Sequence, residues 1–389
     1  MRVLFCAVPA TGHIEPMVPL IRALMARGDQ VAWAGATETH PKMQALGVQR
    51  CFEVGPSLAA AHADCLRRWP QAGSACAPAM DPKSFSRLFG AVLAPAMLDG
   101  LVLAIRQWAP RVVVSETGAL AAPLACELTG CMQVTHGFGM PPPSGLLQEA
   151  ADAIAPCWHR VTGGQPPDDV GLFRHLYLDI YPLPLQPPER VRTQRCQRLQ
   201  ACVPQRADPQ RPPAQWSDRW RQLAHWPLVY LTFGTVVNQA LALPLASAAL
   251  AGLRARIVIT VGHDGNLHPL SPLPPNVHVE RFIAQADLLP HCDLVVSHGG
   301  SGTLLASLAH GLPQMVLPQG ADQFTNALAL ETGGAGISLQ QCDASAHRVL
   351  DAAQMLLDGP RYRRAATGIA AHMAAMPGAD EVATRLASL

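Results

Sequence analysis

A glycine-rich turn between an apolar run and an Ala/Leu-rich segment is the clearest chemical feature of the sequence. Residues 293–311, DLVVSHGGSGTLLASLAHG, are typical of a strand, a turn and a helix. The turn contains three glycines, which let a backbone come close to a ligand: Gly299, Gly300 and Gly302. Ser301 and Thr303 add hydroxyls at the helix start, where unpaired N–H groups and the positive end of the helix dipole suit a pyrophosphate.

Three further polar side chains flank this turn. His298 directly precedes it, in a position to donate a hydrogen bond to a phosphate oxygen. After the next apolar run, the loop PQGADQ places Asp322 and Gln323 beyond a strand end, where sugar hydroxyls can be held. An HGGSG sequence alone is equally compatible with a turn that binds nothing. Together with PQGADQ at this spacing, it predicts a site for a sugar-nucleotide diphosphate.

A second candidate residue, His13, lies near the amino terminus in the loop PATGHIEPMVPL (9–20). The loop follows the first apolar run, and open α/β sheets bind their ligands beyond the carboxyl ends of such strands. A histidine that titrates near neutral pH suits the removal of a proton from a hydroxyl that attacks a sugar. The alternative is a capping or solvent-facing loop histidine.

Alternating strands and helices must position these residues. Candidate strands of the first half are RVLFCAV (2–8), QVAWAG (30–35), RVVVSE (111–116) and MQVTHGF (132–138). Those of the second half are PLVYLTFG (227–234), ARIVITVG (255–262), NVHVERF (276–282), DLVVSHGG (293–300) and PQMVLPQ (313–319). Between the first two strands lies a helical pattern that stops at Gly28, the expected C-terminal cap. Strands this apolar predict an α/β fold with parallel sheets covered by helices on both faces.

The length and composition predict two domains. With 389 residues, 49% apolar and 15% charged, the chain has enough apolar material for two cores. Eight prolines within residues 182–213 favour an inter-domain connection there, although a surface excursion within one domain is the alternative. We therefore expect an N-terminal domain over 1–205, a C-terminal domain over 214–372 and a final helical segment over 373–389. Residues 56–90 are expected to form an irregular insertion, and the tail two helices broken near 377–378.

Charge and cysteine usage exclude several classes of partner. The net charge of +1 gives no reason to expect nucleic acid or an anionic membrane surface. The amino terminus resembles a first strand more than a signal peptide, and no uninterrupted apolar stretch reaches membrane-spanning length. The 11 cysteines are scattered without a CxxC pair, which predicts reduced thiols in a cytoplasm. The histidines show no HxxxH or HxH spacing, so no metal site is expected.

Residues 280–327, from ERFIAQADLLPHC to PQGADQFTNA, resemble the donor-binding signature of glycosyltransferase family 1. The form resembles the bacterial natural-product branch, because Arg281-Phe282-Ile283 replaces the tryptophan-led opening of the plant version. The resemblance implies the GT-B fold, in which two Rossmann-like domains face each other across a cleft. It also implies inverting transfer from a UDP- or dTDP-sugar to a hydrophobic small-molecule acceptor by a monomer or homodimer.

The resemblance further assigns roles to residues of the donor side. Residues implied to meet the nucleobase are Phe282 or Ile283 by packing, Gln285 through its backbone, and Val261 and Gly262 at the pocket rim. Residues implied to approach or hold the diphosphate are Gly234 and Thr235 of LTFGTV, with His298, Gly300, Ser301, Gly302 and Thr303. Asp322 and Gln323 are implied to hold the sugar, and Gly12 is counted with the donor-binding residues.

On the acceptor side, PATGHIEPMVPL matches the family's Gly-His-x-x-Pro pattern and makes His13 the expected general base. Many members orient this histidine with an aspartate from a later strand end, whereas this chain has Glu116 there. Contact of Glu116 with the acceptor or with a helix terminus is the alternative. His136, in HGFG at another strand end, is a candidate acceptor contact, with a structural turn histidine as the alternative.

The predicted activity is therefore glycosyl transfer without a cofactor. The sequence has no Asp-x-Asp motif, which predicts metal-independent transfer. One alternative is a non-catalytic partner of a true transferase, which would be expected to lose His13 or PQGADQ, and both are present. A second is a sugar-nucleotide epimerase of the same architecture, for which no set of base and carboxylate groups is identified.

Overall fold

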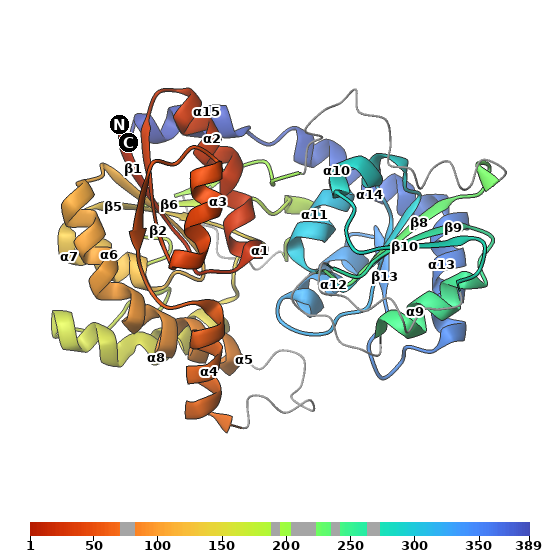
Figure 1. The fold of residues 1–389 in the computed structure, drawn as a ribbon, viewed down its shortest axis with the longest axis horizontal. Coiled ribbons are helices and arrows are strands. Elements are labelled where there is room, and N and C mark those ends of the chain that lie inside the picture. The colour runs from red at the N-terminus through yellow and green to blue at the C-terminus, as the bar shows by residue number, and fades with distance from the viewer. Residues whose placement is uncertain (71–81, 188–194, 204–222, 235–241, 263–272) are drawn as a thin grey trace. The chain divides into compact units, whose positions relative to one another are not determined.

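The computed structural model of the chain describes residues 1–70, 82–187, 195–203, 223–234, 242–262 and 273–389. The chain forms two compact units (Figure 1). Unit 1 comprises Met1–Tyr181, Pro188–Cys202 and Met376–Leu389, and unit 2 comprises Pro182–Pro187 and Val203–Ala375. Each unit is built around its own parallel sheet, so the predicted α/β fold class is confirmed.

The sheet of unit 1 has the strand order β3-β2-β1-β4-β5-β6-β7, with every pair parallel. Its strands are β1 (Arg2–Cys6), β2 (Gln30–Gly35), β3 (Arg50–Glu53), β4 (Val112–Glu116), β5 (Met132–His136), β6 (Leu176–Asp179) and β7 (Cys196–Arg198). The order reverses between β1 and β4. In doubly wound sheets this switch point opens a crevice beyond the carboxyl ends of the strands, where ligands bind.

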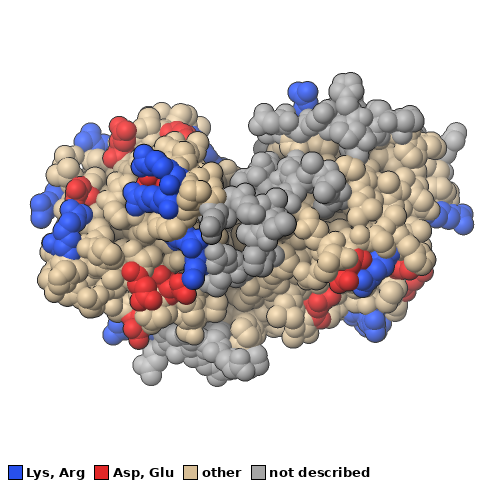
Figure 2. All heavy atoms as spheres, turned by 90° about the horizontal axis from the view of Figure 1, so that it is seen from below, with Lys and Arg blue, Asp and Glu red and all other residues tan. Residues whose placement is uncertain are grey.

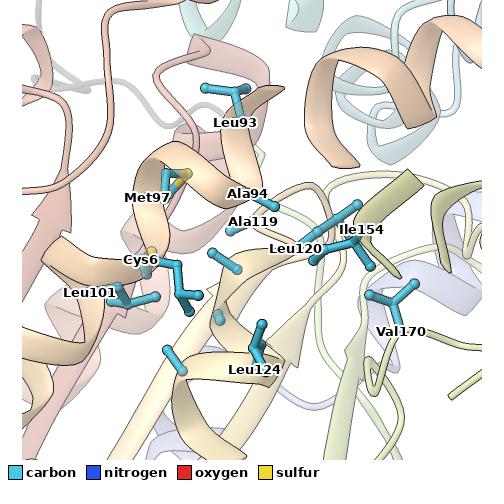
Figure 3. Close-up of a cluster of buried hydrophobic side chains, with 14 of the residues drawn as sticks. Cys6, Leu93, Ala94, Met97, Leu101, Ala119, Leu120, Leu124, Ile154 and Val170 are labelled. Atoms are coloured by element: carbon cyan, nitrogen blue, oxygen red, sulfur yellow. The ribbon is translucent and has the colours of Figure 1, made fainter. Parts of the chain in front are cut away.

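The helices of unit 1 cover both faces of its sheet. They are α1 (Thr11–Ile14), α2 (Val18–Ala26), α3 (His40–Ala45), α4 (Leu58–Arg68), α5 (Pro82–Phe85), α6 (Ala94–Trp108), α7 (Ala121–Thr129), α8 (Ser144–Thr162) and α15 (Ala379–Ala387). Among its described residues, unit 1 also has the 3-10 turns η1 (Glu15–Met17) and η2 (Thr37–Thr39) and the π-helix η4 (Ser86–Leu93). Alternate residues of β1, such as Leu4 and Cys6, join the core formed with α6, α7 and α8. Figure 3 shows Cys6 in this core beside Met97 and Leu101 of α6.

The sheet of unit 2 has the order β10-β9-β8-β11-β12-β13 and is also fully parallel. Its strands are β8 (Leu228–Thr232), β9 (Arg256–Thr260), β10 (Val277–Glu280), β11 (Leu294–Ser297), β12 (Gln314–Val316) and β13 (Gly336–Ser338). Its helices are α9 (Ala242–Ala251), α10 (Gln285–Leu288), α11 (Ser301–Ala309), α12 (Gln323–Thr332), α13 (Ala346–Asp358) and α14 (Pro360–Ala374), with the 3-10 turns η5 (Leu183–Leu185) and η8 (Leu289–His291). The order reverses between β8 and β11, which gives this unit a switch point of the same kind.

The nine predicted strands all occur, with their ends shifted by a few residues. Gly28 lies directly beyond α2 with a φ of +85°, and the tail forms α14 and α15 on either side of residues 377–378, both as predicted. The final helix α15 contacts α2 within unit 1. The prediction of an irregular insertion over 56–90 is wrong in part. The Ala-rich run after Ser57 forms α4, with the Ser57 hydroxyl capping its first turn.

One long helix, Lys83–Trp108, is apolar enough to cross a membrane by length and composition alone. It consists of most of α5 together with η4 and α6, and 61% of its most apolar window is buried inside the protein. Core helices have the same composition, and several residues of this helix belong to the core of unit 1. On the face in Figure 2, the charged side chains of the described residues form small groups of both signs among uncharged residues.

Candidate active site

The predicted site residues gather at the two switch points, one in each unit. In unit 1, His13 follows β1 and Glu116 ends β4, and these two strands are neighbours. In unit 2, Gly234 follows β8 and His298 follows β11, which are neighbours as well. Because the strands are parallel, the residues of each pair lie at the same edge of their sheet.

His13 and Glu116 are hydrogen-bonded to each other. The His13 Nδ1 and Glu116 Oε2 atoms are 2.8 Å apart, with 14% of the histidine side chain exposed and none of the glutamate side chain. With Nδ1 as the donor to the carboxylate, Nε2 is left without a proton and can act as a base. The structure thus brings together the two residues predicted to form the base and its orienting carboxylate.

The buried carboxylate of Glu116 is fixed by two backbone N–H groups as well. Val8 donates to Oε1 at 3.1 Å, and Gly118 donates to Oε2 at 2.5 Å. A Cβ atom at position 118 would lie 3.0 Å from His13 Cε1 and 3.1 Å from Glu116 Oε2, so a glycine allows this close approach. The longer side chain of a glutamate therefore fits this strand end, with hydrogen bonds for both of its oxygens.

Two aromatic rings pack on the imidazole of His13. The ring centroid of Phe138 is 4.0 Å from that of His13, and the centroid of Phe89 is 5.4 Å away. The interplanar angles are 31° and 28°, so both phenylalanines lie roughly parallel to the imidazole. Phe85 extends the apolar surface from Phe89, at a centroid distance of 4.7 Å. These rings restrict the rotation of His13 and present an apolar surface beside it.

The other two predicted residues of this edge differ in exposure. Gly12 is exposed in α1, and nothing lies within 4 Å of the position that a Cβ would take. His136 has no exposed surface, and its Nδ1–H donates to the Gly137 carbonyl at 2.6 Å. Burial lowers the pKa of His136 to about 4, against the opposing effects of this hydrogen bond and of the Glu116 charge. This placement favours the structural alternative for His136 over direct contact with an acceptor.

In unit 2, the ring of His298 lies between two glycines. A Cβ at position 234 would lie 2.8 Å from His298 Cε1, and one at position 300 would lie 2.6 Å from Nε2. Gly234 also has a φ of +71°, which side chains disfavour. Burial lowers the pKa of His298, with Asp322 acting in the opposite direction. A neutral ring here can donate one hydrogen bond toward a phosphate at the start of α11.

A hydrogen-bond network joins the glycine-rich turn to the PQGADQ loop. Ser301 Oγ donates to Asp322 Oδ2 at 2.7 Å. Asn326 Nδ2 lies 2.9 Å from the Gly299 carbonyl, 3.0 Å from Ser301 Oγ and 3.0 Å from Asp322 Oδ2. Gly302, in contrast, is exposed and has open space where a Cβ would be. The network fixes the start of α11 relative to Asp322 and leaves the Gly302 side of the turn open.

Two glutamines hold the surrounding loops. The Gln323 side-chain oxygen accepts from the backbone N–H groups of Gln319 and Gly320 at 2.7 and 3.1 Å, so Gln323 shapes the loop that was predicted to hold the sugar. Gln285 Nε2 donates to Thr303 Oγ1 at 3.1 Å, on the first turn of α11. The predicted backbone contact of Gln285 with a nucleobase stays a prediction.

The residues implied to form the nucleobase pocket lie around the ends of β9 and β10. Val261 and Ile283 are buried in the cores, and Gly262 has a φ of +85° at the end of β9. The side chain of Phe282 is 56% exposed, so of the two packing candidates it is the one with a surface available to a ligand. Thr235 lies outside the described residues.

Comparison with known proteins places this site in a family. The family described as erythromycin biosynthesis protein CIII-like, C-terminal domain, matches residues 245–389. Elloramycin glycosyltransferase ElmGT of Streptomyces olivaceus is 32% identical over 99% of this chain and 97% of its own length. L-demethylnoviosyl transferase of Streptomyces niveus is 32% identical over 100% and 98%. The chain belongs to the natural-product glycosyltransferases.

This glycosyltransferase also resembles solved structures over its whole length. The spinosyn rhamnosyltransferase SpnG, complexed with thymidine diphosphate, is 25% identical and has a TM-score of 0.79, with 100% of both chains covered. The match confirms the predicted GT-B fold class for this glycosyltransferase and its assignment to the bacterial natural-product branch.

Several residues of the site were not identified in the sequence of this glycosyltransferase. Phe89, Phe138 and Gly118 are far from His13 in the sequence, and no motif indicates that they surround it. The position of Asn326 could have been predicted, because it lies four residues after Asp322 on a helix and so one turn along the same face. Its contacts to both parts of the predicted donor site follow from that position.

Proposed function

We propose that this glycosyltransferase moves a sugar from a UDP- or dTDP-sugar to a hydroxyl of a hydrophobic small molecule, with inversion at the anomeric carbon. The observation that carries the proposal is the hydrogen bond between His13 Nδ1 and Glu116 Oε2 at the switch point of unit 1. The relative crystallised with thymidine diphosphate supports a nucleoside diphosphate as the leaving group. The apolar surface of Phe85, Phe89 and Phe138 beside His13 supports a hydrophobic acceptor.

In this mechanism His13 is the general base. Its Nε2 takes the proton of the acceptor hydroxyl as the oxygen attacks the anomeric carbon from the side opposite the diphosphate. The imidazole becomes positively charged, and the buried carboxylate of Glu116 stabilises that charge through the Nδ1–H hydrogen bond. Because Val8 and Gly118 already hold the carboxylate, the stabilising group is in place before the charge develops.

The donor half of the reaction takes place at the start of α11. As the glycosidic bond breaks, negative charge accumulates on the β-phosphate, and the N–H groups of the first helical turn favour that charge. His298 adds a hydrogen bond, and Asp322, held by Ser301 and Asn326, faces the sugar hydroxyls. No Asp-x-Asp motif is present in the sequence, so we propose that this transfer needs no metal and that chelation leaves the rate unchanged.

The substitution His13→Ala tests the proposal. Transfer to an acceptor should be lost, while binding of dTDP or UDP measured by calorimetry should be retained, because the diphosphate site belongs to unit 2. Full transfer activity in this variant would contradict the assignment of the base. Incubation of the wild-type protein with donor alone separates the epimerase alternative, which predicts a new epimer. A non-catalytic partner would give no transfer with either protein.

A further inference from the structure

The end of α7 brings two cysteines together on unit 1, at the edge of the sheet opposite His13. Gly130 follows the helix in the left-handed conformation, with a φ of +65°. The Cys131 N–H donates to the Cys126 carbonyl at 3.1 Å, and the Gly130 N–H donates to the Glu127 carbonyl at 3.4 Å. This pair of bonds defines a Schellman motif. In this motif the side chains at the two positions occupied here by Cys126 and Cys131 commonly contact each other.

The side chains of Cys126 and Cys131 shift each other's pKa in opposite directions. The hydrogen bond from Cys126, together with backbone groups of Met132 and Val113, lowers the pKa of Cys131 below its usual range. The same hydrogen bond and burial raise the pKa of Cys126. As a thiol, Cys131 donates to the Pro110 carbonyl, with Sγ 3.4 Å from the oxygen. Cys131 is therefore the readier nucleophile, and Cys126 keeps its proton.

Both cysteines line a pocket of about 540 Å³. Met132 and Leu176 are the first residues of β5 and β6 and also line it, so the pocket lies at the amino ends of these strands. Arg174, paired with Glu127 at 2.8 Å, contributes a guanidinium to the same pocket. Cys131 is only half-buried, whereas Cys126 is 3% exposed. A small oxidant in the pocket can thus reach Cys131 first, next to a resolving thiol.

We propose that Cys126 and Cys131 form an oxidation site that hydrogen peroxide or a small organic hydroperoxide converts to a disulfide. The Cys131 thiolate attacks one peroxide oxygen, forming an S–O bond as the O–O bond breaks, and the leaving oxygen takes a proton to give water or an alcohol. The Cys126 sulfur then attacks the Cys131 sulfenic acid, forming the S–S bond and releasing water. Two thiols are oxidised and one peroxide is reduced to two molecules of water or to one of water and one of alcohol.

Peptide mapping after mild oxidation tests this site in the full-length protein. Reduced enzyme is treated with hydrogen peroxide, then alkylated in denaturant so that every remaining thiol is labelled. With proteolysis after Glu127, we expect a peptide pair linked through residues 126 and 131, lighter than the two reduced peptides by two hydrogen atoms and separated by dithiothreitol. The exposed Cys342 serves as the internal control for an ordinary surface thiol, and it should be oxidised more slowly.

Single substitutions resolve the order of the steps. In Cys126→Ser, Cys131 should stop at a sulfenic acid that a 1,3-dicarbonyl reagent traps, and in Cys131→Ser, residue 126 should remain a thiol. Cys342→Ser should leave the 126–131 link unchanged. The proposal is overturned if wild-type protein keeps both thiols while Cys342 is oxidised, or if Cys131 proceeds to a sulfinic acid without the link. Both of these outcomes are measured on wild-type protein, so they do not depend on the folding of a variant.

Discussion

The imidazole of His13 is restrained on two sides by residues that the acceptor does not need to contact. Glu116 holds the Nδ1 edge at 2.8 Å, and Phe138 covers a face at a centroid distance of 4.0 Å. A ring held at one edge and across its face has one remaining edge for chemistry, which carries Nε2. The proposed base therefore depends on the carboxylate for its tautomer and on the aromatic rings for its direction.

The carboxylate can be tested by Glu116→Gln. A glutamine can present its N–H₂ group to His13 and thereby favour the wrong tautomer, and it cannot stabilise an imidazolium. We expect kcat to fall by on the order of 10²–10⁴, as for the loss of an orienting carboxylate in other general-base sites. Binding of dTDP, measured by calorimetry, should be unchanged. Glu116→Asp is the matched variant, because it keeps the charge and should retain more activity than Glu116→Gln. Equal rates for Glu116→Gln and wild type would contradict the role of the carboxylate.

The contact between Phe138 and His13 predicts a smaller loss of activity. An aromatic pair is worth roughly 1 kcal/mol beyond its buried area, so Phe138→Ala should lower kcat/KM by about five- to tenfold. Phe138→Leu keeps an apolar side chain without a ring, and it should fall between the alanine variant and wild type. Steady-state kinetics with a fixed acceptor measure the effect, and the Tm of each variant shows whether the fold is intact. Unchanged kcat/KM in the alanine variant would show that the ring does not direct His13.

At the residue scale, the sequence revealed those site residues that lie within continuous motifs. The run around His298 could be recognised because a strand end, a glycine turn and a helix start follow one another directly. Glu116 was implied only by the family resemblance, because it reaches His13 through pairing of β1 with β4. Phe89 and Phe138 were not recognised, because they reach His13 only through the packing of distant segments. The sequence could not separate the two alternatives for His136 for the same reason, since its burial depends on neighbouring strands.

The start of α11 is an element whose geometry depends on individual glycines. Gly300→Ala places a Cβ 2.6 Å from His298 Nε2, so the ring must move, and we expect a lower Tm and about tenfold weaker binding of dTDP. Gly368→Ala in α14 is the matched control, because its Cβ enters open space and the residue lies outside the proposed diphosphate site. In a His298→Ala background the Gly300→Ala substitution should cost much less stability, as a double-mutant cycle would show. Additive costs would contradict a steric conflict between the two residues.

His136, at the end of β5, predicts how the stability of the protein depends on pH. His136 has a pKa of about 4 in the folded protein, against about 6.5 when unfolded, so the unfolded chain binds more protons between these values. The free energy of unfolding should therefore be unaffected by this group above pH 6.5. It should fall by up to about 3 kcal/mol as the pH decreases to 4. Urea titrations of His136→Asn at several pH values should show a shallower decline. Buried His298 remains in that variant, so part of the slope should persist. An equally steep decline would contradict burial of His136 in its neutral form.

At the scale of elements, the apolar central strands were predictable, and three of the edge strands were not. The central strands β1, β4, β8 and β11 are apolar because helices cover both of their faces, and this composition appears directly in the sequence. The edge strands β3, β7 and β13 have three or four residues and mixed polarity, so no hydrophobic run marks them. β7 also falls in the proline-rich region 182–213, where Arg198 pairs with Asp179 at 2.8 Å. Its pairing with β6 decides its conformation more than its own sequence does.

At the scale of the whole molecule, the two units repeat one arrangement and divide the reaction between them. Each sheet reverses its strand order once, and each reversal holds one of the two residue sets, with the proposed base in unit 1 and the proposed diphosphate site in unit 2. Displacement at the anomeric carbon requires the acceptor oxygen and the leaving phosphate to be in line within a few ångströms. Neither unit can therefore complete the transfer alone, and the segments that join them must allow the two sites to meet.

This requirement leads to a prediction about the dimensions of the molecule. The chain passes between the units near residues 181, 187, 202 and 375, so a change in their arrangement is confined to a few connecting positions. If a nucleoside diphosphate binds unit 2 as proposed and the units close before transfer, saturating dTDP should reduce the radius of gyration measured by small-angle X-ray scattering. Thermal-shift measurements on the same sample establish that the ligand is bound, since a ligand of the folded state raises the Tm. Gly300→Ala, with weakened binding, should require more ligand for the same contraction. A raised Tm with unchanged dimensions would show that donor binding and closure are separate events, and closure would then have to await the acceptor.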